Sequence, residues 1–311
     1  MQAKVLVNTL NMDRETWLAM RSKGIGGSDV AALAGLSKWK SPVQVYLEKT
    51  GLLQKEDVQS DAAYFGNILE DIVAKEFSLR TGLKVQRRNA ILQHPEYPWM
   101  LANVDRLIVG ERVGLECKTT SEYNKKEWEG DEIPAAYLLQ CQHYMAVTGY
   151  EAWWIAVLIG GNKFVYKKVE RDEDIIHYIT TIEKDFWLEH VEKQEPPMFD
   201  GTEASGELLK QMYPDALKDS FVSLGQQAEL LIEARNQVEA ELKALEKQKA
   251  EYENKLKAML GENEAGGTEK YTITWKSVTS KRIDSKKLQQ EMPEIYAKYA
   301  KESSSRRFAI K

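Results

Sequence analysis

Two charged residues interrupt an otherwise apolar segment in the middle of the chain. Residues 113–119 read Val-Gly-Leu-Glu-Cys-Lys-Thr, and Asp105 stands eleven residues before Glu116. Because strand side chains alternate between two faces, we expect Glu116 and Lys118 to point the same way and Cys117 to point to the opposite face. Unpaired charge in an apolar strand is costly, so the segment predicts a site where acids and an amine converge. The alternative is a surface ion pair of little energetic consequence.

The apolar periodicity along the first 200 residues predicts a mixed α/β chain. Helical spacing and capping residues predict helices over residues 13–21, 30–34, 41–50, 62–80, 134–148 and 172–193. Alternation and turn residues predict strands over residues 84–92, 100–109, 113–119, 152–159 and 163–169. Asp105 and Glu116 then lie on neighbouring strands, and Glu70 lies on the helix before them. We expect a central mixed sheet flanked by helices.

The rest of the chain predicts an appended helical region. We expect a core domain over residues 1–200, which ends near Pro196-Pro197, and a linker over residues 201–223. Residues 224–260 predict a long helix with a coiled-coil-like seam, and residues 261–311 a small basic element with a short strand at 271–275. Apolar residues recur in that helix at intervals of seven: Leu224, Leu231, Val238, Leu245, Tyr252 and Met259. The seam packs either against the core or against another subunit.

The charge is distributed unevenly along the chain. The net charge is −5, but residues 270–311 carry eleven Lys or Arg and four acids, or +7, which leaves −12 for residues 1–269. The basic end either contacts nucleic-acid phosphates or is a solvated tail. No window approaches the roughly 18 apolar residues that cross a bilayer, so we expect a soluble, intracellular protein without membrane contact. Two cysteines and four scattered histidines lack the spacing of a disulfide framework or a zinc site.

The acids suit phosphodiester hydrolysis, which needs an activated water and a stabilised anionic transition state. Two divalent metal ions supply both, and Mg²⁺ prefers hard oxygen ligands. We expect Asp105 and Glu116 to hold the first metal with the backbone carbonyl of Cys117, and Glu70 to complete the second metal site or its water shell. Lys118 then orients the attacking water or favours its deprotonation. For Glu70 alone, a solvated helix face is the alternative.

A second signal lies near the amino terminus, where Arg21 precedes the glycine-rich run Gly24-Ile-Gly-Gly-Ser-Asp29. Glycines allow close backbone approach, the following helix offers free amide groups, and an arginine can clamp a phosphate. The run predicts a pocket for a terminal phosphate. An ordinary capped turn is the alternative.

Together these residues resemble the YqaJ-like viral recombinase family, relatives of phage lambda exonuclease within the PD-(D/E)XK nuclease superfamily. The match covers roughly residues 14–190, and Asn103 stands near the superfamily's proline. Its anchors are Arg21 with the glycine run, Gly66-x-x-x-Glu70, Asn103-Val104-Asp105, Glu116-x-Lys118 and Gln140-Cys-Gln142-His-Tyr144-Met. The resemblance implies a restriction-endonuclease-like core and a Mg²⁺-dependent enzyme, with two ions per site and Mn²⁺ able to substitute. It also implies a location in the cytoplasm of a bacterial host cell.

The resemblance also implies roles and partners. It implies an exonuclease that degrades the 5′ strand of linear duplex DNA and leaves a 3′ single strand for an annealing protein, and it implies a ring-shaped homo-oligomer, a trimer by preference. Asp105, Glu116, Lys118 and Glu70 match catalytic positions, and Arg21 and Ser28 match the 5′-phosphate contacts. Either Gln142, or Gln140 together with Tyr144, matches the catalytic glutamine motif. Trp39 either contacts or wedges the duplex end or is a buried core tryptophan.

Two other functions fit the same residues. One is an endonuclease that cuts internally, which closed circular DNA would distinguish from an exonuclease because a circle has no end. The other is a DNA-end-binding recombination accessory protein that does not hydrolyse DNA.

Overall fold

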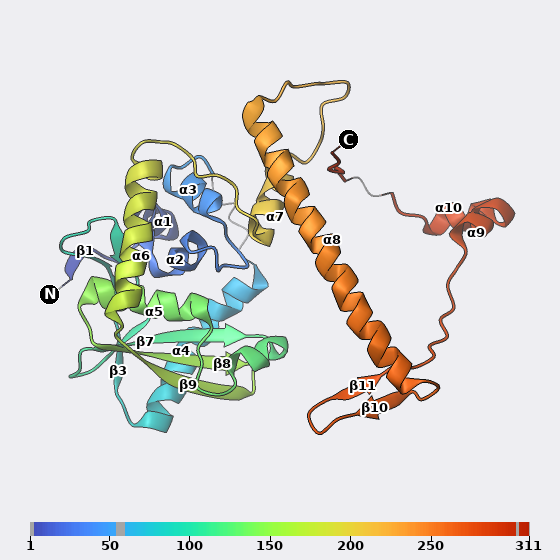
Figure 1. Cartoon of the computed structure of the whole chain (residues 1–311). Coiled ribbons are helices and arrows are strands. Elements are labelled where there is room, and N and C mark those ends of the chain that lie inside the picture. Colours follow the sequence, from blue (N-terminus) through green and yellow to red (C-terminus); the bar gives the residue numbers. More distant parts are fainter. Residues whose placement is uncertain (1–2, 54–59, 303–304, 311) are drawn as a thin grey trace. The chain divides into compact units, whose positions relative to one another are not determined.

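The chain forms two compact units, residues 1–213 and 214–311. The computed structural model describes residues 3–53, 60–302 and 305–310. The first unit is a mixed α/β core, and the second is mostly helical (Figure 1). The expected central mixed sheet with flanking helices and a carboxy-terminal helical region is confirmed.

A five-stranded sheet lies at the centre of the first unit. Its strands β7 and β8 are parallel, and every other neighbouring pair is antiparallel. In spatial order the strands are β3 (Val85–Arg87), β6 (Arg106–Ile108), β7 (Val113–Thr120), β8 (Ala152–Ile159) and β9 (Lys163–Glu170). Strand β7 is therefore central, which buries its apolar residues on both faces.

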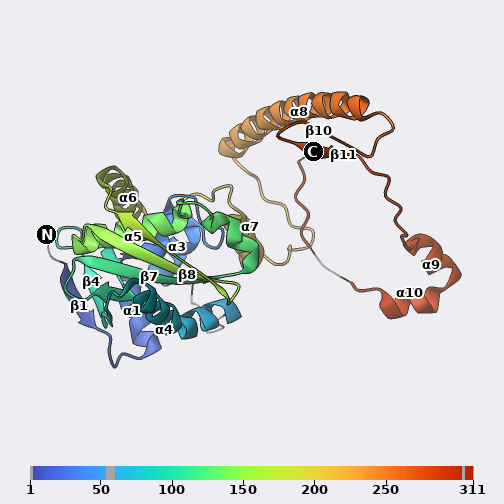
Figure 2. The ribbon, with the colours of Figure 1, turned by 90° about the horizontal axis from the view of Figure 1, so that it is seen from below.

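Helices cover both faces of this sheet (Figure 2). The helix α4 (Asp61–Thr81) packs Val73 and Phe77 on one face, against Leu115 and Cys117 of β7. The helix α5 (Ala135–Thr148) packs on the opposite face, against alternate residues of β8. Since Cys117 faces α4, its neighbours Glu116 and Lys118 face α5, as the alternation predicts.

The first unit also contains a smaller sheet and further helices. The sheet orders β1 (Lys4–Asn8), β4 (Ala90–Gln93), β5 (Met100–Ala102) and β2 (Ile25–Gly26). The helices are α1 (Arg14–Arg21), α2 (Gly27–Leu33), α3 (Pro42–Lys49) and α6 (Glu173–Asp185), which continues into η2 (Phe186–Val191). The 3₁₀ helix η1 (Glu122–Trp128) follows β7. An apolar cluster joins α2, α3, α5, α6 and η2.

Two predicted strands are each divided in the structure. Residues 84–92 form β3 and β4, and residues 100–109 form β5 and β6, with one half of each in either sheet. The second division falls at residues 103–105, where the chain leaves the small sheet for the large one. Asp105 is thereby placed at the entrance to β6, directly beside β7.

The segment expected as a linker contains a helix, α7 (Glu203–Met212). Its Ala204, Ser205 and Leu208 are buried, and the first compact unit extends to Tyr213. Thr202 caps this helix by accepting a hydrogen bond from the backbone N–H of Ser205, and Asp200 accepts hydrogen bonds from the hydroxyls of both residues. The helix therefore belongs to the core, because its amphipathic face has a core surface to cover.

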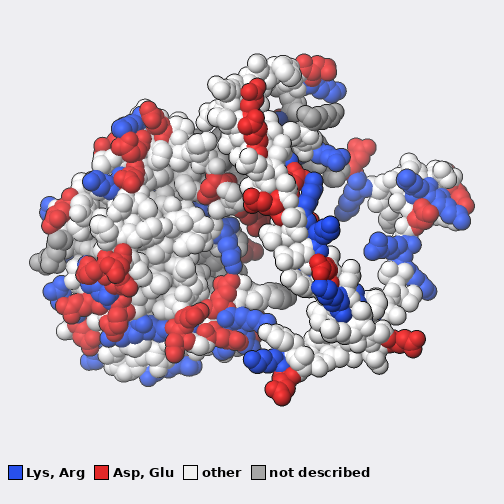
Figure 3. All heavy atoms as spheres, viewed as in Figure 1, with Lys and Arg blue, Asp and Glu red and all other residues white. Residues whose placement is uncertain are grey.

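The second unit consists of one long helix, a short hairpin and two short helices: α8 (Gln226–Leu260), β10 (Ala265–Gly267) with β11 (Thr272–Thr274), α9 (Ser285–Glu291) and α10 (Pro293–Tyr299). Charged side chains of both signs are interspersed along α8 (Figure 3), and several form pairs four residues apart, such as Arg235 with Glu239. The heptad residues of this helix are exposed within the chain. Across the described ranges of both units, no helix is long and apolar enough to span a membrane.

Candidate functional site

Asp105, Glu116 and Lys118 meet beside β7. The ammonium group of Lys118 lies 2.6 Å from Oε1 of Glu116. Asp105 accepts a 2.8 Å hydrogen bond at Oδ2 from the backbone N–H of Cys117. Glu116 is 3% exposed, so its charge is compensated inside the protein and not by water. These residues therefore form a buried site and not the surface ion pair weighed from the sequence.

The acids of this site repel one another. Burial raises the pKa of Asp105 well above its usual range, and the negative charges of Glu116 and Glu70 raise it further. Lys118 responds in the opposite sense: burial acts to lower its pKa, but Glu116 and Asp105 outweigh burial and raise it. Three carboxylates within electrostatic reach of one another and an ammonium that keeps its proton make a site that attracts cations.

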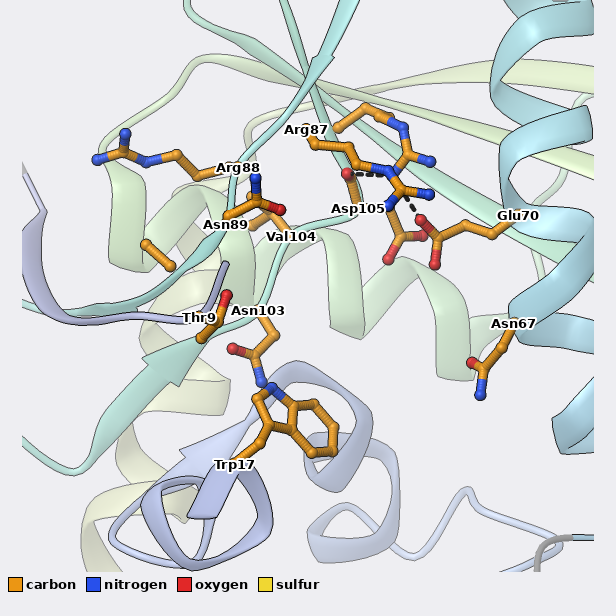
Figure 4. A pocket seen from close by; sticks show the side chains of 12 residues that line it. Thr9, Trp17, Asn67, Glu70, Arg87, Arg88, Asn89, Asn103, Val104 and Asp105 are labelled. Carbon is orange, nitrogen blue, oxygen red and sulfur yellow. Dashed lines mark hydrogen bonds and ion pairs between the residues drawn. The ribbon is translucent and has the colours of Figure 1, made fainter. Parts of the chain in front are cut away.

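Glu70 approaches the same place from α4 and is held there by Arg106. The guanidinium of Arg106 donates a hydrogen bond to Oε1 of Glu70. Figure 4 shows the carboxylates of Glu70 and Asp105 close together at one end of a pocket of about 330 Å³. Polar side chains line much of the pocket, among them Asn67, Arg87, Arg88, Asn89 and Asn103, and Trp17 also lines it.

The two candidate glutamines of α5 point to different places. Gln140 donates from Nε2 to Oε1 of Glu116, at 2.7 Å, and to the hydroxyl of Tyr144, at 2.9 Å. Gln142 instead bonds the carbonyl of Glu170 and the backbone N–H of Asp172. Residues two apart on a helix do not share a face, so only one of the two can reach β7. The structure brings together Gln140, Tyr144 and Glu116, and it leaves Gln142 outside this group.

Some of the carboxylates of this site, but not all, are suited to bind a hard divalent cation. Oε2 of Glu116 is buried without a hydrogen-bond partner, and a cation beside it would also relieve the repulsion that raises the pKa of Asp105. Cys117 offers no thiolate, because burial raises the pKa of its thiol and its side chain faces α4. Among the residues that the structure describes, no group of three or more Asp, Glu, His or Cys side chains is arranged to hold a metal ion. Asp105 and Glu116 are thus the two carboxylates that fit, while Glu70 is engaged by Arg106.

The amino-terminal motif forms a second polar site. The side chain of Arg21 donates a 2.6 Å hydrogen bond to Ser28 and lies over the ring of Trp17, 5.0 Å from its centroid. Gly27 packs on α5, since an added Cβ would lie 2.7 Å from the Tyr144 ring. The glycine run therefore connects the Arg21 site to the helix that carries Gln140.

A buried charge cluster supports Arg21. Asp29 is 1% exposed and pairs with Lys49 at 2.7 Å and with Lys40 at 3.1 Å. Burial acts to raise the pKa of Asp29, but Lys49, Lys40 and Arg21 outweigh burial and hold it well below its usual range. Lys49 also donates to the backbone carbonyl of Arg21. The cluster ties α1, α2 and α3 together behind the Arg21 side chain.

The structure decides between the two alternatives for Trp39. It also adds two residues to the site, Arg106 and Lys49. Trp39 is 83% exposed on the loop before α3, so the alternative of a buried core tryptophan is wrong. Arg106 and Lys49 were not among the expected site residues. Their partners lie 36 and 20 positions away in sequence, and the usable sequence signal for Arg106 was its position directly after Asp105.

Comparison with known proteins identifies the family. Residues 16–151 match the YqaJ-like viral recombinase domain. Over 312 residues the chain is 47% identical to a protein of Bacillus subtilis (strain 168) named "Uncharacterized protein YqaJ", and the alignment covers 100% of this chain and 98% of that relative. The chain belongs to the YqaJ-like viral recombinase family. The matched domain contains every expected site residue of this family member, from Arg21 to Tyr144.

Two solved structures show more distant similarity to this YqaJ-like chain. An alkaline exonuclease from Laribacter hongkongensis is 20% identical, with a TM-score of 0.49 over 64% of this chain and 97% of that chain. A phage related exonuclease from Haemophilus somnus 129PT is 12% identical, with a TM-score of 0.40 over 63% of this chain and 100% of that chain.

Proposed function

We propose that this protein is a metal-dependent deoxyribonuclease that degrades the 5′ strand of linear duplex DNA from its end. One observation carries the proposal: buried Glu116 bonds Lys118 and Gln140 through Oε1 and keeps Oε2 without a partner, beside Asp105. A buried carboxylate oxygen without a partner is costly unless a cation or substrate group binds it. Membership of a recombinase family supports DNA as the substrate.

Asp105 and Glu116 would hold the metal, Mg²⁺ by preference with Mn²⁺ as a substitute, and a bound metal supplies Lewis-acid stabilisation of the phosphate. Lys118 acts as a fixed positive charge, because its raised pKa keeps it protonated. In that state it orients the attacking water and favours loss of the water's proton by charge, and it does not accept the proton itself. Gln140 holds Glu116 on the other side, and Tyr144 fixes Gln140.

In this proposal Arg21 and Ser28 recognise the 5′ end of the DNA. Their side chains meet at 2.6 Å, and a guanidinium with a hydroxyl beside it suits the oxygens of a terminal 5′ phosphate. Phosphate contacts position a strand without reading its bases, as degradation through any sequence requires. Trp39, exposed between Lys38 and Lys40, would contact the duplex end.

The product would be a 3′ single strand, which an annealing protein takes up in phage or prophage recombination. A ring-shaped homo-oligomer, a trimer by preference, would enclose the DNA and keep the enzyme on it. The proposals of an annealing protein and of a homo-oligomer are both based on the family resemblance. The exposed heptad residues of α8 would serve as a contact between subunits.

The test is digestion of linear duplex labelled at either the 5′ or the 3′ end, with Mg²⁺ and with a chelator. We expect early release of 5′-labelled mononucleotides with Mg²⁺ and none with chelator. Covalently closed circular duplex serves as the control and should survive. Cutting of the circle would establish the endonuclease, and binding of duplex ends without degradation under any metal would establish the accessory protein.

A further inference from the structure

His143 is a fully buried histidine of α5, one helical turn after Gln140. Both nitrogens of its ring are bonded. Nδ1 lies 2.7 Å from Oε1 of Glu183 on α6, and Nε2 lies 2.8 Å from the backbone carbonyl oxygen of Leu101 on β5. One side chain thus connects three elements of the core, and no step of the proposed hydrolysis uses it.

The two bonds of His143 determine where its protons lie. A carbonyl oxygen only accepts, so Nε2 carries a hydrogen and donates it to Leu101. One further proton lies between Nδ1 and Glu183, because two acceptors would otherwise face each other at 2.7 Å. Burial raises the pKa of Glu183. Burial acts to lower the pKa of His143, but Glu183 and the bond to Leu101 outweigh burial and raise it, so the pair keeps its shared proton at neutral pH.

Stability alone does not explain why this pair is buried. Glu183 is as fully buried as His143, and its Oε2 has no hydrogen-bond partner. Removing two such groups from water costs free energy that their attraction often fails to exceed, and apolar residues of similar volume are often equally stable or more stable in their place. A buried pair can instead specify one arrangement of the elements that it joins.

The rotation of α5 about its axis is the arrangement that this pair can specify. The apolar cluster shared by α5 and α6, which includes Leu139 and Ile179, requires volume and shape but tolerates small shifts. Hydrogen bonds weaken steeply with misalignment, so His143 meets both of its partners only near one rotation. Residues three apart on a helix are neighbours, and the same rotation directs Gln140 to Glu116 at 2.7 Å.

We propose that His143, through its pair with Glu183, is a positioning residue that fixes the rotation of α5 and thereby aims Gln140, an inference that rests on the proposed function. His143 touches neither metal nor DNA in this role and acts through the bond between Gln140 and Glu116. A misplacement of about 1 Å at a catalytic group can slow a reaction about 100-fold. The pair therefore matters for the rate of hydrolysis and little for the binding of DNA.

The test is steady-state digestion of linear duplex by the full-length chain, with kcat, the KM for duplex ends and urea unfolding measured together. In the double-leucine variant, His143→Leu with Glu183→Leu, we expect kcat to fall about 10- to 100-fold and KM to stay within about twofold of the wild type. Its free energy of unfolding should equal or exceed that of the wild type, because no unpaired charge is left buried.

Glu183→Gln alone is the conservative variant and should keep the wild-type kcat. Its amide can donate to Nδ1 of a neutral His143, while Nε2 still donates to Leu101. His177→Leu is the matched control, since His177 is an exposed histidine on the same helix as Glu183, and it should change neither kcat nor KM. A loss of rate in Glu183→Gln equal to that in the double-leucine variant would contradict the proposed role.

A double-mutant cycle with Gln140 separates positioning from a general structural role. In a Gln140→Ala background, the double-leucine substitution should change kcat less than about twofold, because residues that act as one unit are not additive. Multiplied effects, or a wild-type kcat in the double-leucine variant, would overturn the inference. Where circular dichroism shows that this variant is unfolded, His143→Gln with Glu183→Leu decides in the same cycle, since the glutamine amide can still donate to Leu101. A wild type that digests no linear duplex would overturn the proposed function itself.

Discussion

The amide nitrogen of Gln140 lies 2.7 Å from Oε1 of Glu116, across the interface between α5 and β7. The same nitrogen lies 2.9 Å from the hydroxyl of Tyr144, one helical turn further along α5. Together with Lys118, these contacts occupy one oxygen of Glu116 and leave the other without a hydrogen-bond partner. The glutamine therefore determines which oxygen of the carboxylate remains available for a cation.

The two glutamines of α5 should respond differently to removal. We expect Gln140→Ala to slow digestion about 10- to 100-fold at saturating Mg²⁺, because Glu116 loses the group that orients it. Gln142→Ala is the matched control: it should keep the rate but lower the free energy of unfolding by about 1–3 kcal/mol, since two part-buried hydrogen bonds to the backbone of residues 170 and 172 are lost. Rate assays and urea unfolding of both variants check this. If only Gln142→Ala loses rate, the catalytic role belongs to Gln142 and not to Gln140.

Replacement of Arg21 should change the preference for phosphorylated ends. We expect the wild type to digest 5′-phosphorylated duplex faster than 5′-hydroxyl duplex and Arg21→Gln to lose about tenfold on the phosphorylated substrate only, because a charge-assisted hydrogen bond contributes about 1.5–3 kcal/mol. Initial rates on the two substrates measure the ratio. An equal loss on both would mean that Arg21 acts on the fold or on DNA in general.

An alanine at Gly27 should disturb the site by steric contact. The added Cβ would lie 2.7 Å from the Tyr144 ring and 3.1 Å from the Gln140 side chain, and overpacking of this kind typically costs about 1–3 kcal/mol. We expect lower stability and slower digestion together, since Tyr144 and Gln140 must move. Gly206→Ala, on α7 with open space around it, is the control and should leave both unchanged or raise stability slightly. Full activity in Gly27→Ala would contradict the packing described.

Asp29 should contribute stability that depends on pH. Its pKa in the folded protein is depressed below the usual 3.8, because Lys49, Lys40 and Arg21 outweigh burial. Folding therefore gains stability from this carboxylate above about pH 4, and the gain is lost as the pH falls toward and through the depressed pKa. We expect Asp29→Asn to lose about 3–5 kcal/mol at pH 7, with a smaller difference from the wild type near pH 3. Urea unfolding at both pH values measures it, and a difference that stays constant would refute the assignment.

Local patterns in the sequence were sufficient for most elements of the core. The strands β7, β8 and β9 follow from alternation and turn residues, and α4 and α5 from apolar spacing and terminal glycines. The edge strand β1 was not predicted, because it is stabilised by pairing with β4, more than 80 residues away. The helix α7 was also not predicted, because its short amphipathic face is stabilised by the core that it covers.

The candidate site could also be predicted from the sequence only in part. Alternation alone placed Glu116 and Lys118 on one face of β7, and the structure confirms that placement. The choice between Gln140 and Gln142 needed the rotation of α5 about its axis, which three-dimensional packing sets. The roles of Arg106 and Lys49 needed contacts between elements distant in sequence, which no local pattern encodes.

The most direct test of the central claim is digestion by Glu116→Gln. Glutamine keeps the size of the side chain and its contact with Gln140 but removes the negative charge that would bind the metal. We predict that Mg²⁺-dependent release of nucleotides from linear duplex falls below detection, while binding of duplex ends and the unfolding transition stay close to those of the wild type. Digestion by Glu116→Gln at the wild-type rate would contradict the site and, with it, the proposed enzyme.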